Sequence, residues 1–229
     1  PEKIADTVMA QLTGEQRKLY LANQDRIAQQ VQHREAGEFK KDKLKVLAEL
    51  TKLRQICCDP RLHYEDYKAG SAKLDTCMEL VHGALDGGHR ILLFSQFTGM
   101  LDIIGKRLSK EDIAFLKLTG ASSKESRAKM VAQFQAGEVP VFLISLKAGG
   151  VGLNLTAADV VIHYDPWWNV AAQDQATDRA HRIGQQHTVT VYKLIAKDTI
   201  EERIMQMQES KRDLVNSVLG GDGISSALF

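Results

Sequence analysis

Apolar residues in the first part of the chain recur at the spacing of an α-helix. Steps of four, three and four place on one predicted helix face Val46, Leu50, Leu53 and Cys57. Pro60 biases the residue before it away from the α conformation, so we expect this helix to end at Asp59. The charged stretch 37–45 is typical of a solvated turn between two helices. We therefore predict that residues 1–70 form a helical subdomain without strands.

From Ser71 onward, short apolar runs alternate with amphipathic helices. Ser71 is suited to cap a helix that ends at Gly87-Gly88 and has an apolar face of Leu74, Cys77, Val81 and Leu85. Strands are predicted at residues 91–94, 114–118, 141–144, 160–163 and 189–194. Further helices are predicted at residues 98–108 and 123–134, from about residue 170, and at residues 199–219. Such alternation predicts an α/β fold with a parallel sheet and helices on both faces.

The change of pattern divides the chain into three parts. The helical subdomain (1–70) precedes the α/β domain (71–198), and a helix with a tail (199–229) is expected to brace that domain. In open parallel sheets, ligands bind beyond the carboxyl ends of the strands. The candidate positions are therefore those that directly follow strands: Ser95, Gln96, Thr119, Gly120, and the segments 145–154 and 164–169.

Composition and charge add three constraints. A chain of 229 residues with 44% apolar residues is long enough for one α/β domain with a sizeable core and a small appendage. Lys and Arg number 30 against 29 Asp and Glu, so DNA binding would have to come from local patches. The cysteines, at positions 57, 58 and 77, favour a reducing compartment over a disulfide framework or a zinc site.

No apolar run has the length of a membrane span, so we expect no membrane partner. A chain that starts at Pro1 is expected to be a piece of a longer protein.

Two partial nucleotide-binding signatures depart from their consensus. In residues 99–106, five residues separate the glycines where a P-loop has four, and Arg107 replaces the hydroxyl residue that holds magnesium. Gly150 and Gly152 follow a predicted strand, but Leu155 stands where a dinucleotide-binding turn has its third glycine. Both departures count against a self-sufficient nucleotide-binding enzyme such as a dehydrogenase.

The segment 173–185 concentrates charged side chains. Arg179 and Arg182 are three residues apart, so a helix would project both guanidinium groups from one face; Asp178 and His181 form a second such pair. Two guanidinium groups present about ten N–H donors, which suit anionic oxygens such as those of phosphate. Taken alone, the pattern fits a solvated, salt-bridged helix face equally well.

This segment is the last of five blocks that occur in a fixed order. The earlier blocks are Leu53-Arg-Gln-Ile-Cys57 with Pro60, Ile91-Leu-Leu-Phe-Ser-Gln-Phe97, Leu118-Thr-Gly120 with Arg127 and Phe134, and Ser145-Leu-Lys-Ala-Gly-Gly-Val-Gly-Leu-Asn-Leu155. Asp165-Pro-Trp-Trp-Asn169 lies between the last two blocks. Together they resemble the C-terminal half of the Swi/Snf-type ATPases, within the second helicase superfamily. Asp59 departs from the family, which usually has His before the proline, and that affects the packing of the helical segment.

The resemblance implies a RecA-like lobe that shares an ATP site with an N-terminal RecA-like lobe of the same polypeptide. That other lobe would supply the P-loop, the Mg²⁺ ligands and the catalytic acidic pair. Arg182, and with it Arg179, would act as arginine fingers on the transferred γ-phosphoryl group. The resemblance also implies that four further residues lie beside the nucleotide: Gln175, Gly150, Gly152 and Asp178.

The resemblance also implies contacts with double-stranded DNA. It assigns the phosphates of one strand to Ser95, Gln96, Thr119, Gly120, Ser145 and Lys147, a set that suits sequence-independent binding. Trp168 resembles the family's aromatic residue near the duplex, although a core or interface position fits it equally well; Trp167 is expected to be structural. A DNA-bound protein is a further expected partner.

We therefore expect the second motor lobe of an ATP-dependent DNA translocase, a remodeller of protein–DNA complexes that is inactive without its partner lobe. The alternative is a nucleic-acid-binding module without a catalytic role. Short connections favour a compact bacterial version, which would act in the cytoplasm or nucleoid; a eukaryotic version would be nuclear.

Overall fold

The computed structural model describes residues 1–32, 39–145 and 152–214, and the chain forms two compact units. The sheet unit comprises Pro1–Met9 and Asp75–Ile195. The helical unit comprises Ala10–Leu74 and the chain from Ala196 onward. Each unit is therefore built from segments that are distant in sequence.

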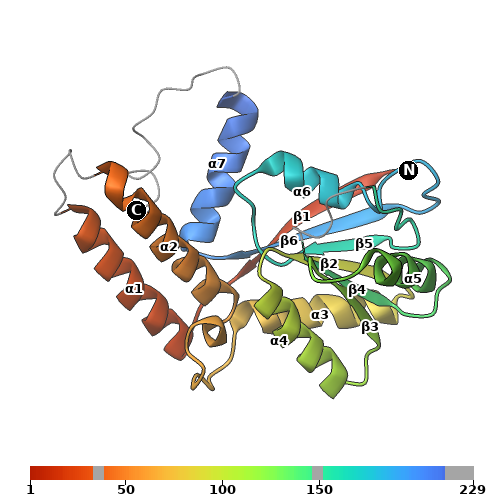
Figure 1. The fold of residues 1–229 in the computed structure, drawn as a ribbon, viewed down its shortest axis with the longest axis horizontal. Coiled ribbons are helices and arrows are strands. Elements are labelled where there is room, and N and C mark those ends of the chain that lie inside the picture. The colour runs from red at the N-terminus through yellow and green to blue at the C-terminus, as the bar shows by residue number, and fades with distance from the viewer. Residues whose placement is uncertain (33–38, 146–151, 215–229) are drawn as a thin grey trace. The chain divides into compact units, whose positions relative to one another are not determined.

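The sheet unit is built on six parallel strands within the described residues (Figure 1). They are β1 (Lys3–Ala10), β2 (Ile91–Ser95), β3 (Phe115–Leu118), β4 (Val141–Ser145), β5 (Val160–His163) and β6 (Val189–Ala196). Their order in the sheet is β1-β6-β5-β2-β4-β3. Each strand from β2 to β6 coincides with an apolar run that the sequence predicted as a strand. In β2, β4 and β5 every residue is buried, which explains why these runs are continuously apolar.

Helices cover both faces of this sheet, as predicted. They are α3 (Ala72–Asp86), α4 (Thr98–Lys110), α5 (Lys124–Gln135) and α6 (Val170–Thr177). Phe134 of α5 and Ala176 of α6 share one apolar cluster with Phe94 and Phe142, which face one side of the sheet. On the other side, Gly105 of α4 packs so closely on the ring of Phe115 that an added Cβ would lie 3.0 Å from it. A larger residue there would push α4 off the sheet.

Three of the predicted helices, α3, α5 and α6, begin with a side-chain cap. Ser71 Oγ accepts from Leu74 N at 3.3 Å, and Ser123 Oγ accepts from Ser126 N at 3.1 Å. Asn169 Oδ1 accepts from Ala171 N at 3.0 Å at the start of α6. Each cap satisfies a backbone donor that the first helical turn leaves without an intrahelical partner.

The prediction that residues 1–70 lack strands is wrong, because residues 3–10 form the edge strand β1. Val189 N donates to Glu2 O at 3.0 Å, and Lys197 N donates to Ala10 O at 2.8 Å, which keeps β1 parallel to β6 along its length. Most of β1 is exposed, so its residues carry no continuous apolar run. Backbone hydrogen bonds with β6 determine the extended conformation of β1, and the residue types of β1 alone do not predict this pairing.

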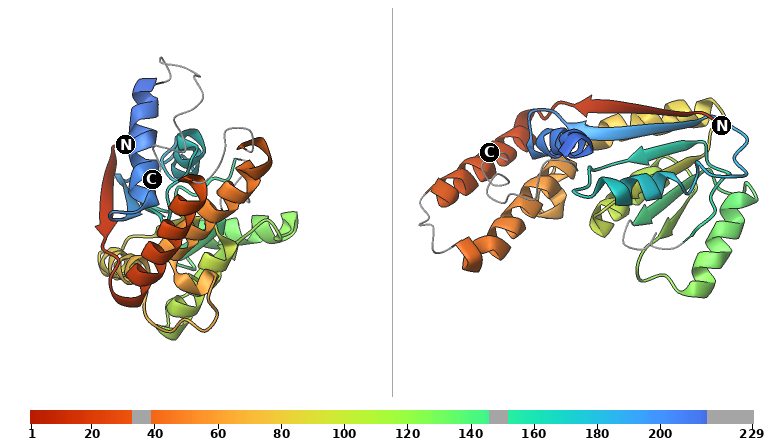
Figure 2. Two further views of the ribbon diagram at one scale, coloured as in Figure 1. Left: turned by 90° about the vertical axis from the view of Figure 1, so that its left-hand side faces the viewer. Right: turned by 90° about the horizontal axis from the view of Figure 1, so that it is seen from above.

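The helical unit contains α1 (Gly14–Gln32), α2 (Phe39–Cys58), a short 3₁₀ turn (Pro60–Leu62) and α7 (Ile200–Leu214). The two views of Figure 2 show α1 and α2 side by side, and Arg26 Nη2 meets Glu49 Oε2 across them at 2.6 Å. α2 ends directly before Asp59, as predicted. The predicted turn at 37–45 is too long, because α2 already begins at Phe39.

A buried ion pair lies inside the helical unit. Lys73 Nζ donates to both carboxylate oxygens of Glu201 at 2.9 Å, and both side chains are 0% exposed. Glu201 Oε1 also accepts from Ala196 N at 2.8 Å. Nearby, Ile200 N donates to the hydroxyl of Tyr20 at 2.8 Å, and burial raises the pKa of Tyr20. The start of α7 is thereby tied to α1 and to the segment that begins α3.

Among the described helices, none combines the length and the hydropathy that crossing a bilayer requires.

Candidate functional site

The carboxyl ends of four neighbouring strands carry polar residues. β5, β2, β4 and β3 are adjacent in that order, and their ends lead into Asp165, Ser95, Ser145 and Thr119. The parallel register places Ser95 directly opposite Ser145. The strand ends that the sequence singled out therefore lie along one edge of the sheet, where open parallel sheets bind ligands.

Ser95 is buried, and its hydroxyl group is engaged within the fold. Its Oγ donates to Asp165 Oδ1 at 2.5 Å and accepts from Phe97 N at 3.1 Å. Asp165 Oδ2 accepts from Gln96 N at 3.1 Å, and Gln96 Nε2 donates to Pro166 O at 3.0 Å. One carboxylate thus fixes the turn after β2, and Gln96 is the half-buried residue of that turn.

Ser145, at the end of β4, is 1% exposed, and within the described residues its Oγ has no hydrogen-bond partner. Two other predicted site residues, Lys147 and Gly150, lie outside the described residues. Gly152 resumes the described chain with φ +56°, in the left-handed region that favours glycine, and a Cβ there would meet nothing within 4 Å. Backbone conformation, and not crowding, is therefore the constraint at this glycine.

Thr119 and Gly120 form a turn after β3 that is held from two sides. Thr119 N donates to Ser122 Oγ at 3.1 Å, and Ser122 N donates to Thr119 O at 3.0 Å. Arg127 Nε donates to Ser122 O at 3.2 Å, which ties the turn to α5. Gly120 itself is exposed at the tip, so the turn presents backbone to solvent.

The aromatic turn after β5 leads into α6. Trp167 and Trp168 are both half-buried, so each lies between a core position and a fully exposed one. Gln173, buried on α6, accepts from Trp167 N through its Oε1 at 3.3 Å. This bond fixes the backbone of the turn against the helix that follows it.

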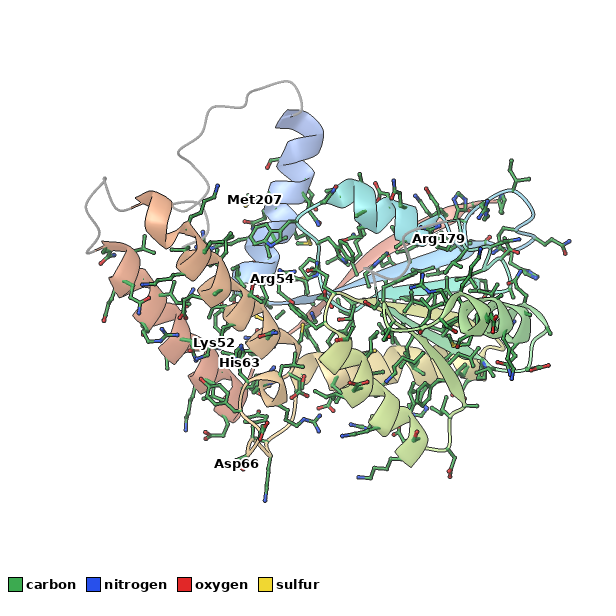
Figure 3. The ribbon with its side chains drawn as sticks, in the orientation of Figure 1. Lys52, Arg54, His63, Asp66, Arg179 and Met207 are labelled. Carbon is green, nitrogen blue, oxygen red and sulfur yellow. The ribbon has the colours of Figure 1, made fainter. Side chains whose placement is uncertain are left out.

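The prediction that Arg179 and Arg182 project from one helix face is wrong, because α6 ends at Thr177. Both arginines belong to the loop that follows, and Figure 3 labels Arg179 there. Burial lowers the pKa of Arg179, and the nearby charge of Arg182 lowers it further, while Asp178 opposes the shift. Arg182 is exposed, and its Nη1 donates to Leu153 O at 3.3 Å. The two guanidinium groups are therefore close neighbours, as expected, but a loop and not a helix holds them.

The other residues predicted beside the nucleotide lie on or just after α6. Gln175 is exposed on the helix, and exposed Asp178 is its C-terminal cap residue. The prediction that Asp178 and His181 share a helix face is wrong for the same reason, since both follow the last residue of α6. His181 Nε2 instead makes a 2.9 Å hydrogen bond with Pro1 O.

Gln185 organises this loop and was not among the predicted site residues. Its Nε2 donates to the carbonyl oxygens of Thr156, Ala158 and Ala180 at 2.8–3.0 Å. Its Oε1 accepts from Gln186 N and His187 N at 3.0 and 3.1 Å. A glutamine directly after a glycine, at the end of a polar segment, was the available signal. Only the tertiary structure reveals that this side chain is buried, with 6% of its surface exposed.

Predicted site residues lie before and after α6. The aromatic turn directly precedes the helix, and Gln96, directly after β2, is bonded to this turn through Asp165 and Pro166. Thr119 and Gly120 follow β3, two strands further along the same edge of the sheet. The arginine loop is beyond the end of α6, against the segment 153–158 that leads into β5: Leu155 N donates to Arg179 O at 3.0 Å.

His163 is a second residue that sequence reasoning missed. It is buried at the end of β5, stacks on Phe94 with ring centroids 5.5 Å apart, and its Nε2 lies 2.9 Å from Thr177 Oγ1. Burial, helped by the charge of Lys193, lowers its pKa to about 3. His163 is therefore neutral at physiological pH and helps to hold α6 on the sheet.

Within the described ranges, no group of three or more His, Cys, Asp or Glu side chains is arranged to hold a metal ion. The described residues that suit a nucleotide are the two arginines, whose guanidinium groups match phosphate oxygens.

Comparison with known proteins identifies the family. Residues 72–184 match the helicase conserved C-terminal domain. The fold is similar to that of the SWI2/SNF2 ATPase C-terminal domain from Sulfolobus solfataricus, with a TM-score of 0.80 and 33% identity, over 97% of this chain and 92% of that one. This chain belongs to the SWI2/SNF2 ATPase family and corresponds to its C-terminal domain. Its RecA-like α/β fold, predicted from the sequence, is confirmed.

Two further similarities are to longer proteins, of which this SWI2/SNF2 domain covers only a part. An ATP-dependent helicase from Mycoplasma pneumoniae is 40% identical over 223 residues, which is 97% of this chain and 21% of the relative. The S. solfataricus SWI2/SNF2 ATPase core in complex with double-stranded DNA has a TM-score of 0.81 and 37% identity, over 99% of this chain and 47% of that one. The chain thus spans about a fifth of the length of the curated relatives it matches.

Proposed function

We propose that this chain is the second motor lobe of an ATP-dependent translocase that moves along double-stranded DNA. One observation carries the proposal: residues suited to phosphate lie both at the carboxyl ends of the strands and in the arginine loop after α6. A motor that couples ATP hydrolysis to DNA movement needs one surface for each ligand, joined by a rigid element. The similarity to a SWI2/SNF2 core in complex with double-stranded DNA supports the same division.

At the end of α6, Arg182 and Arg179 reach the γ-phosphoryl group of ATP held mainly by the N-terminal lobe. Positive charge there stabilises the negative charge of the transition state. The exposure of Arg182 supports this role, since its guanidinium group is accessible to a ligand. Gln175, Asp178 and the backbone at Gly150 and Gly152 complete the near side of the nucleotide. Mg²⁺, with most phosphate ligands, comes from the N-terminal lobe.

At the carboxyl edge of the sheet, the segments that follow the strands hold one DNA strand by its phosphates. Gln96, Thr119, Gly120 and Lys147 offer amide, hydroxyl, backbone and ammonium donors, a set that binds phosphate without reading sequence. Ser145 adds a hydroxyl group that no described residue uses. Ser95 acts through Asp165, by fixing the turn that carries Gln96. Trp168, half-buried beside this edge, packs near the duplex.

The test is ATP hydrolysis by the protein that carries both lobes. Arg182→Ala is expected to lower the DNA-stimulated rate by about a thousandfold or more. Arg17→Ala removes the same charge from an exposed position on α1 and is expected to leave the rate unchanged. Normal hydrolysis by Arg182→Ala would overturn the arginine-finger assignment. It would favour a nucleic-acid-binding module, whose DNA affinity is salt-dependent and indifferent to both arginines.

The chain without its partner lobe is expected to hydrolyse ATP negligibly, because half of the site is elsewhere. Appreciable turnover by this chain alone would contradict the shared-site proposal.

A further inference from the structure

Ile183 is an apolar side chain that the described fold leaves entirely in water: it is 100% exposed. Single exposed apolar residues are common on protein surfaces, so exposure alone implies no role. The position of Ile183 is what distinguishes it, because it directly follows Arg182 in the loop after α6.

The backbone holds Ile183 at the tip of a closed turn. Gln185 N donates to Arg182 O at 3.0 Å, which closes a four-residue turn with Ile183 and Gly184 at its centre. Gly184 has φ +101°, which suits glycine at the third position of such a turn. The side chain of Gln185 then anchors the turn to Ala158 and to Ala180. Ile183 is therefore displayed by a preorganised loop and cannot fold back onto its own unit without breaking it.

We propose that Ile183 docks on the ATP-bound N-terminal lobe when the two lobes close. This inference rests on the proposed role of Arg182. Adjacent Cα atoms are about 3.8 Å apart, so a guanidinium group that contacts the γ-phosphoryl group brings Ile183 onto the protein surface around that group. The matching partner is an apolar patch of the N-terminal lobe beside the phosphate site.

This contact makes Ile183 a residue that favours closure. Its apolar area is exposed in the open state and buried in the closed state, so the contact stabilises only the closed state. Ile183→Ala removes three carbons of that area and is expected to lower the closure equilibrium constant by roughly tenfold. Ile183→Asp, which brings a charge to the same contact, is expected to lower it further.

The experiment measures lobe closure in the two-lobe protein by energy transfer between dyes on the lobes, with ADP–beryllium fluoride as the ATP mimic. Ile183→Ala is expected to raise the concentration of mimic needed for half-maximal closure by roughly tenfold. ADP alone lacks the γ-phosphoryl mimic, and its affinity is expected to stay unchanged. Gln186→Ala is the matched control, since Gln186 is exposed in the same loop.

Thermal unfolding of each variant checks the fold, and no change is expected for a side chain that is fully exposed. Wild-type closure by both Ile183 variants would overturn the docking inference. An equal loss of ADP affinity would also overturn it, because it would place Ile183 against the nucleotide and not the lobe. Failure of the proposed function has a different signature, which is normal hydrolysis by Arg182→Ala.

Discussion

Two charged pairs show how differently the two units of this chain use charge. Lys73 and Glu201 in the helical unit have opposite charges, lie fully buried and satisfy each other at 2.9 Å. Arg179 and Arg182 in the sheet unit have like charges, and the proximity of Arg182 lowers the pKa of Arg179. In the first pair, the charges and hydrogen bonds of both side chains are used within the fold. In the second pair, burial is the largest cause of the lowered pKa of Arg179, the charge of Arg182 adds to it, and Asp178 opposes it.

The difference gives a criterion for separating structural from functional charges in this molecule. A buried pair whose hydrogen-bonding capacity is filled inside the fold has nothing left for a ligand. A like-charged pair with one exposed member presents N–H donors to solvent, and a perturbed pKa of this kind is typical of sites that bind a charged partner. Mutation of the two pairs should therefore change the free energy of unfolding by very different amounts.

The largest effect on folding is expected from Glu201→Ala. It leaves the ammonium group of Lys73 buried without a counter-charge, and breaking a buried pair in this way costs about 3–5 kcal/mol. Urea unfolding of the chain measures the loss. The control is Glu209→Ala, which removes a carboxylate from an exposed position of the same helix and should cost less than about 0.5 kcal/mol.

A double variant sharpens this test. Replacing Lys73 with Met and Glu201 with Leu removes both charges together, and it should be less destabilising than Glu201→Ala because no charge remains buried. A double variant as unstable as the single one would show that packing, and not the ion pair, holds the start of α7.

An intermediate effect is expected from His163, a buried titratable group of the sheet unit. Its pKa of about 3 in the fold lies below the ordinary value of 6.5. Between these two pH values, the histidine is protonated in the unfolded chain and neutral in the folded chain. The contribution of the neutral side chain is complete above pH 6.5 and is lost as the pH falls toward 3. The expected slope is about 1.4 kcal/mol per pH unit within that window.

Urea unfolding between pH 6.5 and pH 4 measures this slope. The variant His163→Asn has no imidazole to protonate and should show a shallower pH dependence than the wild type. His187→Asn, at an exposed position, tests whether burial is the cause. Parallel stability curves for the wild type and His163→Asn would contradict the assignment.

The smallest effect is expected from Arg182→Ala when the readout is stability. Its side chain is exposed, and its Nη1 donates to Leu153 O at 3.3 Å, so the free energy of unfolding should change by less than about 0.5 kcal/mol. A loss above about 1 kcal/mol would mean that the arginine holds the loop together. The contrast with Glu201 would then disappear.

The sequence predicted β2 to β6, including β3 at one edge of the sheet, and missed β1 at the other edge. β2, β4 and β5 are buried throughout, so each of their positions had to be apolar and the runs are visible. β1 is mostly exposed and owes its conformation to backbone bonds with β6. A pattern of side chains records burial, and it does not record which backbone a strand pairs with.

The candidate site divides in the same way. The choice of candidate residues, Arg179 and Arg182 among them, followed from the order and spacing of the sequence blocks, which also indicated the family. That a loop and not a helix displays the two arginines, that Gln185 fastens this loop, and that Ser95 is engaged by Asp165 followed only from the tertiary structure. The reason is physical: residue type sets what a side chain is able to bind, whereas burial and long-range hydrogen bonds decide which of those groups the folded chain leaves available.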